Sequence, residues 1–145
     1  MSGVTFGSVG DIVAVCLLAR DLAGCFDKTR GSASEYQVLS TELKSLDRAL
    51  LEAALILDRY KNKLGSSATA IADEVSACNT SLRRLRDVVE KYDGAFREDT
   101  SVGLATKVKE SLHWHFSNKE VLNKFRTEIA AHFNTLSMLL ITANL

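Results

Sequence analysis

The stretch that decides the fold is residues 36–64, YQVLSTELKSLDRALLEAALILDRYKNKL. Apolar side chains recur in this stretch at alternating steps of three and four residues: Tyr36, Leu39, Leu43, Leu46, Leu50, Ala53, Leu57, Tyr60 and Leu64. An α-helix completes one turn every 3.6 residues, so this spacing places all of them along one side of a single long helix. An apolar stripe of this length has to be covered by other helices.

A second stripe with the same spacing follows the short sequence Gly65-Ser66-Ser67. It consists of Ile71, Val75, Cys78, Leu82, Leu85, Val89 and Tyr92. Glycine commonly stands just past the end of a helix, which fits Gly65. We therefore expect two long helices, over 34–64 and 67–92, that run antiparallel as neighbours because so few residues join them.

Three further helices are expected, over 10–26, 102–116 and 118–143. The first carries apolar residues around most of its surface, which is typical of a buried central helix. The last begins at a capping box formed by Ser117 and Glu120. Its expected core positions are Leu122, Phe125, Ile129, Phe133, Leu136 and Leu140. The sequence thus predicts an all-α, up-down bundle of about five helices with two long antiparallel central helices.

Length and charge limit the classes of protein to which the chain can belong. The chain has 145 residues, 18 basic and 18 acidic, and no proline. A chain of this size is one domain by the usual size range, and its balanced charge gives no field that would attract nucleic acid. Because Leu145 directly follows the last expected helix, we interpret residues 1–145 as a single domain from the N-terminus of a larger protein.

No residue pattern indicates catalysis. His113 and His115 point to different sides of a helix, so they do not form a metal-binding pair, and His132 is expected to be a hydrogen-bonded histidine at the edge of the core. Glycine-rich phosphate loops and nucleophile motifs are lacking in the sequence. We expect no enzyme activity, no catalytic or metal-ligating residue, no cofactor and no small-molecule substrate.

Localisation is inferred from the apolar runs and the cysteines. The longest uncharged apolar run, residues 12–19, is far shorter than the about 20 residues that a membrane-spanning helix needs. The three cysteines, Cys16, Cys25 and Cys78, are expected to be reduced, as in an intracellular protein. The sequence favours a cytoplasmic domain.

Four parts of the chain resemble a known family. They are the opening Phe6-Gly7-Ser8-Val9-Gly10-Asp11, the entry Glu35-Tyr36 with its leucines, the helix that ends at Lys91-Tyr92, and Trp114 followed by Lys119, Leu122, Phe125, His132, Leu136 and Leu140. Together they are similar to the N-terminal helical domain of fungal proteins of the STAND or NLR-like type, grouped with the HeLo and HeLo-like domains. The resemblance implies a helical bundle that signals in regulated cell death, of the heterokaryon-incompatibility type.

Two candidate segments follow for such a function. In relatives an N-terminal segment inserts into a membrane on activation, which here implies a switch segment with the apolar residues Val4, Phe6, Ile12, Val13, Val15, Leu17, Leu18 and Leu22. Asp11 and Arg20 flank the apolar run and oppose its insertion, because transfer of a charged side chain into lipid costs free energy. The alternative is an interaction or self-association module that uses an exposed helix face with Leu51, Leu55 and Ile56, although these residues also fit a wider core stripe.

Overall fold

The structure is a computed structural model in which residues 9–27, 34–97 and 104–143 are described, with side chains for 9–26, 37–60, 62–90 and 120–143. All of the described residues except Gly65 lie in four helices. These are α1 (Val9–Asp27), α2 (Ser34–Leu64), α3 (Ser66–Arg97) and α4 (Leu104–Ala143). The all-α bundle with two long antiparallel helices is therefore confirmed.

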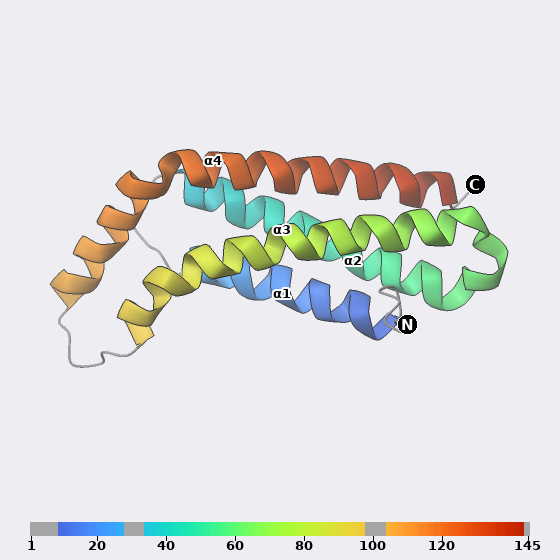
Figure 1. Ribbon diagram of the computed structural model, residues 1–145, viewed down its shortest axis with the longest axis horizontal. Helices are drawn as coiled ribbons and strands as arrows, with labels where there is room; N and C mark the ends of the chain where they lie inside the picture. The colour runs from blue at the N-terminus through green and yellow to red at the C-terminus, as the bar shows by residue number, and fades with distance from the viewer. Residues whose placement is uncertain (1–8, 28–33, 98–103, 144–145) are drawn as a thin grey trace.

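The four helices alternate in direction around one core (Figure 1). α2 packs most closely on α1 and α4, α3 packs mainly on α4, and described residues of α1 and α4 make no contact with each other. The order around the core is thus α1, α2, α4, α3. α2 and α3 are antiparallel, as expected, but they lie across the core from each other rather than as close neighbours, since α4 fills the space between them.

Gly65 makes the sharp connection between α2 and α3. Its φ is 57°, in the left-handed region that residues with a Cβ rarely adopt. The Ala68 amide donates a hydrogen bond of 3.2 Å to the Gly65 carbonyl, which starts α3 directly after the turn. The position of the glycine beyond the α2 stripe predicted this boundary correctly.

The C-terminal part of the fold differs from the expected division. In place of helices over 102–116 and 118–143, one helix, α4, passes through Ser117 and bends towards its N-terminal end (Figure 1). Neither glycine nor proline occurs in Leu104–Ala143, and serine in a helix interior costs only a few tenths of a kcal/mol. The Ser117–Glu120 pattern was therefore a weak start signal, because no helix-breaking residue beside it ends the preceding helix.

The core consists largely of the residues that the stripes predicted. Leu39, Leu43, Leu46, Leu50, Ala53 and Leu57 of α2 are buried, as are Ile71, Val75, Cys78, Leu82 and Leu85 of α3. Five of the six predicted positions in α4 are also buried, and Phe133 is partly buried. Tyr60 is exposed, Leu64 is partly buried against the core, and the side chains of Tyr36 and Tyr92 lie outside the described residues.

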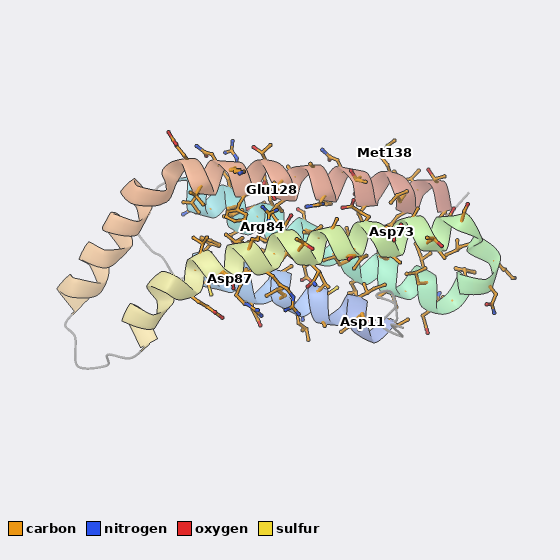
Figure 2. The ribbon with its side chains drawn as sticks, viewed as in Figure 1. Asp11, Asp73, Arg84, Asp87, Glu128 and Met138 are labelled. Atoms are coloured by element: carbon orange, nitrogen blue, oxygen red, sulfur yellow. The ribbon has the colours of Figure 1, made fainter. Side chains whose placement is uncertain are left out.

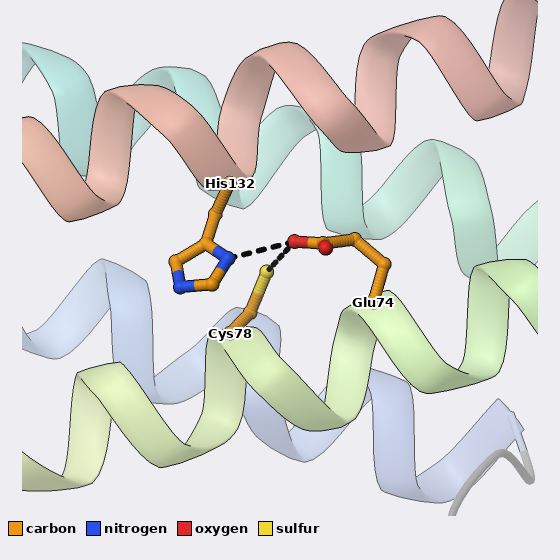
Figure 3. A group of neighbouring side chains, drawn as sticks. All are labelled: Glu74, Cys78 and His132. Atoms are coloured by element: carbon orange, nitrogen blue, oxygen red, sulfur yellow. Dashed lines mark hydrogen bonds and ion pairs between the residues drawn. The ribbon is translucent and has the colours of Figure 1, made fainter.

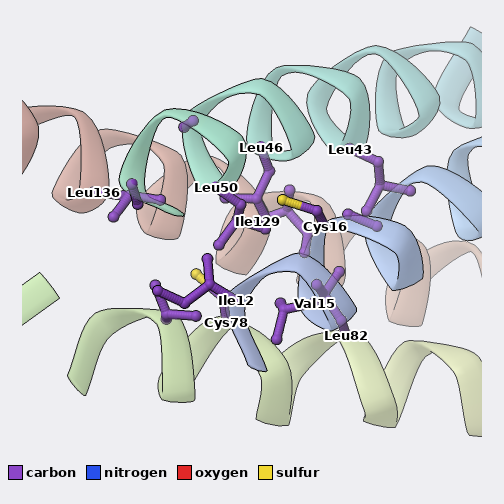
Figure 4. Close-up of a cluster of buried hydrophobic side chains, with 14 of the residues drawn as sticks. Ile12, Val15, Cys16, Leu43, Leu46, Leu50, Cys78, Leu82, Ile129 and Leu136 are labelled. Carbon is purple, nitrogen blue, oxygen red and sulfur yellow. The ribbon is translucent and has the colours of Figure 1, made fainter. Parts of the chain in front are cut away.

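α1 is not buried around its whole surface, which corrects the expectation of a central helix. Ile12, Val15, Cys16, Leu22 and Phe26 are buried, whereas Val13 and Leu17 are exposed. Figure 4 draws Leu46 and Leu50 of α2 in one cluster with Ile12 of α1 and Ile129 of α4. α1 therefore covers one side of the α2 stripe and keeps its own outer side in solvent.

We predict that Leu50→Asp unfolds the domain, whereas Leu51→Asp leaves it folded. Leu50 is 0% exposed and Leu51 is 44% exposed, so only the first substitution would place an unpaired carboxylate in the core. The expected loss is about 4 kcal/mol or more at position 50. Both substitutions carry the same cost in helix propensity, so Leu51→Asp is a matched control in thermal melts followed by circular dichroism. Equal melting temperatures for the two variants would contradict the register of α2.

Candidate functional site

The described residues contain one mixed cluster of acidic, thiol and imidazole groups, between α3 and α4. Glu74 and Cys78 lie four residues apart on α3, and His132 reaches them from α4 (Figure 3). His132 Nδ1 lies 2.7 Å from Glu74 Oε2, and the Cys78 thiol donates a hydrogen bond of 3.4 Å to the same oxygen. The Glu74 carboxylate is therefore the group on which the other two converge.

The hydrogen-bonded chain continues from the other side of the imidazole. His132 Nε2 lies 2.8 Å from Ser81 Oγ, which is 3.1 Å from Glu128 Oε1. The Arg84 guanidinium closes the chain with a charged hydrogen bond of 2.6 Å to Glu128 and one of 3.3 Å to Ser81 (Figure 2). We call these six residues, Glu74, Cys78, Ser81, Arg84, Glu128 and His132, the seam cluster.

The surroundings of the seam cluster are partly apolar and partly open. Burial raises the pKa of the Cys78 thiol well above its ordinary value, and the neighbouring Glu74 carboxylate raises it further. Cys78 is therefore a neutral thiol in the ligand-free protein. A hollow of about 540 Å³ lies next to Ser81 and His132 and is also lined by Arg84 and Glu128. The cluster thus has a dry end at Cys78 and a solvent-facing end at Arg84.

The order Ser81, His132, Glu74 matches the connectivity of a serine hydrolase triad. Acyl transfer also needs N–H groups that are free to bind an oxyanion. The backbone N–H groups around Ser81 lie within α3, where they bond to carbonyls four residues earlier, and Ser81 is only 3% exposed. The geometry therefore favours a structural or ligand-holding role over hydrolysis.

The same cluster contains a set of atoms that suits a metal ion. Glu74, Cys78 and His132 each offer one ligand atom, and these atoms all lie within 4.8 Å of one another. A carboxylate, a thiolate and an imidazole are all ligands of Zn²⁺. No spacing motif marks this set, because His132 comes from another helix. The only sequence signal is Glu74 and Cys78 on one helical face, next to the second apolar stripe.

The candidate switch segment is split between core and surface. Ile12, Val15 and Leu22 are buried, Leu18 is partly buried, and Val13 and Leu17 are exposed. Val4 and Phe6 lie outside the described residues, as do the side chains of His113, Trp114 and His115. The buried members hold α1 on α2, so they are available to a membrane only if α1 leaves the bundle.

The candidate interaction face is smaller than expected. Leu51 and Leu55 are exposed, but Ile56 is 7% exposed and belongs to the core, because it lies towards the buried Ala53 and Leu57. The sequence could not separate these positions, since all three border the stripe. Leu51 and Leu55 remain as the exposed apolar residues of this part of α2.

An ion pair shows how the exposed apolar residues of α1 and α2 are placed. Arg20 Nε lies 3.2 Å from Asp47 Oδ2 across the two helices. α1 and α2 are antiparallel (Figure 1). Counting from this pair towards the N-terminus of α1 therefore reaches Leu17 and Val13 in the same direction along the bundle as Leu51 and Leu55 towards the C-terminus of α2. Val13, Leu17, Leu51 and Leu55 are thus exposed apolar residues on the same side of this ion pair along two adjacent helices, and we call them the α1–α2 strip.

Comparison with known proteins returned nothing. Family models, curated proteins and solved structures gave no match to this chain. Within the described residues, none of the helices has both the length and the apolar character that crossing a membrane requires.

We predict that Ser81→Ala destabilises the domain by about 1–3 kcal/mol, because it leaves the partly buried His132 and Glu128 without a shared partner. Thr80→Ala is the matched control, since Thr80 is exposed and its hydroxyl bonds only to Ser76 of its own helix. The control should change stability by less than about 0.5 kcal/mol. Urea unfolding measures both variants, and equal stabilities would show that the Ser81 hydroxyl does not hold α3 on α4.

Proposed function

We propose that this chain is a non-enzymatic signalling or effector domain that acts through contacts made by its helix faces. The observation that carries the proposal is the α1–α2 strip, Val13, Leu17, Leu51 and Leu55, four exposed apolar residues on two adjacent helices. Single exposed apolar side chains are ordinary on soluble proteins, whereas several along one seam are typical of an interaction surface.

The size of the strip predicts a weak contact. Fully burying one large apolar side chain gains about 1.5–3 kcal/mol, and each residue of the strip is already half-covered. Four such residues supply a few kcal/mol, roughly what association costs in lost freedom of motion. We therefore expect the strip to act when several copies are held close together, as in a signalling assembly, rather than in dilute solution.

The sequence resemblance gives this proposal its biological setting. An N-terminal HeLo-like domain of a fungal NLR-like protein would be a helical bundle, and the all-α fold is consistent with that. We place the domain in the cytoplasm and expect its partner to be a protein, with a second copy of the chain as the first to test. The family assignment rests on the residues quoted for it.

Membrane action on activation is the second candidate function. It is favoured by α1, which has apolar residues on both its buried and its exposed side, so that the freed helix would be apolar around most of its surface. Its cost is the loss of the core contacts of Ile12, Val15 and Leu22. This function therefore needs a trigger that separates α1 from α2.

We predict that the wild-type chain self-associates at high concentration. The double variant Leu51→Glu/Leu55→Glu should prevent this self-association. Like charges on the strip oppose burial against a second copy. The control is Met138→Glu, because Met138 is exposed on α4, whose described backbone does not approach that of α1, and points away from the bundle (Figure 2). Sedimentation velocity over a concentration series measures the effect. A wild-type chain that stays monomeric at every concentration would contradict the self-association form of the proposal.

Liposome leakage separates the two candidate functions. If the domain acts on membranes, the double variant Val13→Glu/Leu17→Glu should abolish leakage, because its charges lie on the inserting helix. The double variant Leu51→Glu/Leu55→Glu should leave leakage unchanged, because its charges lie on α2. All four positions are exposed, so these variants should stay folded, which circular dichroism checks. If wild type and both pairs of variants leak equally, α1 is not the inserting segment.

A further inference from the structure

We propose that Glu74, Cys78 and His132 form a Zn²⁺ site that joins α3 to α4. The proposed ligand atoms are Glu74 Oε2, Cys78 Sγ and His132 Nδ1, with a water molecule in the fourth position. This inference does not depend on the proposed function, since a metal that links two helices would serve an interaction domain or any other use of the bundle.

The chemistry of the ligands favours zinc. Thiolate and imidazole together select borderline metals, whereas Ca²⁺ and Mg²⁺ prefer sites made of oxygen ligands. One thiolate and one carboxylate also balance the two positive charges of Zn²⁺, so a filled site would add no net charge to the partly buried seam. Binding would displace the Cys78 thiol proton and the proton on His132 Nδ1 to solvent, and the sulfur–zinc and nitrogen–zinc bonds would form in their place.

The distances are close to those of a filled site. Tetrahedral zinc, with bonds of about 2.0–2.3 Å, separates neighbouring ligand atoms by about 3.3–3.6 Å. Cys78 Sγ and Glu74 Oε2 are 3.4 Å apart, while His132 Nδ1 and Glu74 Oε2 are 2.7 Å apart. A small opening of the His132–Glu74 pair would therefore admit the ion, since both side chains already point towards the same place (Figure 3).

The groups behind the ligands already have the arrangement that metal sites use. A metal-binding histidine commonly donates its other N–H to a hydrogen-bonded acceptor, which fixes the orientation of the ring. Here His132 Nε2 is 2.8 Å from Ser81 Oγ, and Ser81 is held by Glu128 and Arg84. With Nδ1 on the metal, Nε2–H would donate to Ser81, whose hydroxyl would donate to Glu128. The seam cluster thus supplies both the ligands and their support.

The experiment uses the purified 145-residue chain after treatment with a chelator. Zinc is added, excess is removed by desalting, and the bound metal is counted by mass spectrometry; we expect about one ion per chain. Co²⁺ then replaces Zn²⁺ as a spectroscopic probe. A thiolate ligand produces a charge-transfer band in the near ultraviolet, and four-coordinate geometry produces intense visible bands.

Two cysteine variants make the matched comparison. Cys78→Ser should abolish the charge-transfer band, whereas Cys16→Ser should keep it, because Cys16 is also buried but bonds to the Asp47 carbonyl between α1 and α2. Ser81→Ala should weaken metal affinity by about tenfold or more while the band remains, as expected for a group that only orients a ligand.

The outcomes decide the proposal. Loss of the band in Cys78→Ser alone, with both variants folded by circular dichroism, supports the site. Zinc or cobalt bound without a thiolate band, a band that survives Cys78→Ser, or no retained metal would overturn it. If Cys78→Ser fails to fold, Glu74→Gln takes its place: an affinity reduced by about tenfold or more supports the site, and an unchanged affinity overturns it.

Discussion

The leucine stripe of α2 is the constraint on which the rest of the bundle depends. Leu43, Leu46 and Leu50 are fully buried, and α2 packs closely on both α1 and α4. One narrow stripe therefore positions two helices at once, and α3 completes the core through α4. Removal of apolar surface from water is the largest favourable term in folding, so the helices that cover this stripe have few alternative arrangements.

The order of the helices gives the bundle two different seams on opposite sides. The α1–α2 side carries the exposed apolar residues of the α1–α2 strip and the ion pair of Arg20 and Asp47. The α3–α4 seam holds the polar seam cluster, in which a shift of one helical turn would break every hydrogen bond between the two helices. We propose the first seam for contact with another molecule, whereas the second holds α3 on α4 within the chain.

Sequence periodicity was sufficient for the all-α class and most of the core, and insufficient for the order of the helices, the continuity of α4 and the seams. The steps of three and four residues identified the buried residues of α2 and α3, because burial along a helix depends on local spacing. The same spacing could not show that Ile56 is buried while Leu55 is exposed, since that depends on which helices lie beside α2. The seam cluster also could not be predicted from the sequence, because Glu74 and His132 are 58 residues apart and meet only after α4 has packed on α3.

The place of α4 between α2 and α3 has a consequence for how the chain reaches its native state. α2 and α3 are consecutive in sequence, but each packs chiefly on other helices. A nascent chain that has formed only the first three helices would leave the α4-facing sides of α2 and α3 uncovered. These contacts join residues far apart in the chain, which slows folding and prolongs exposure of apolar surface. During synthesis of this domain, the sides of α2 and α3 that pack on α4 should thus stay exposed until α4 has been made.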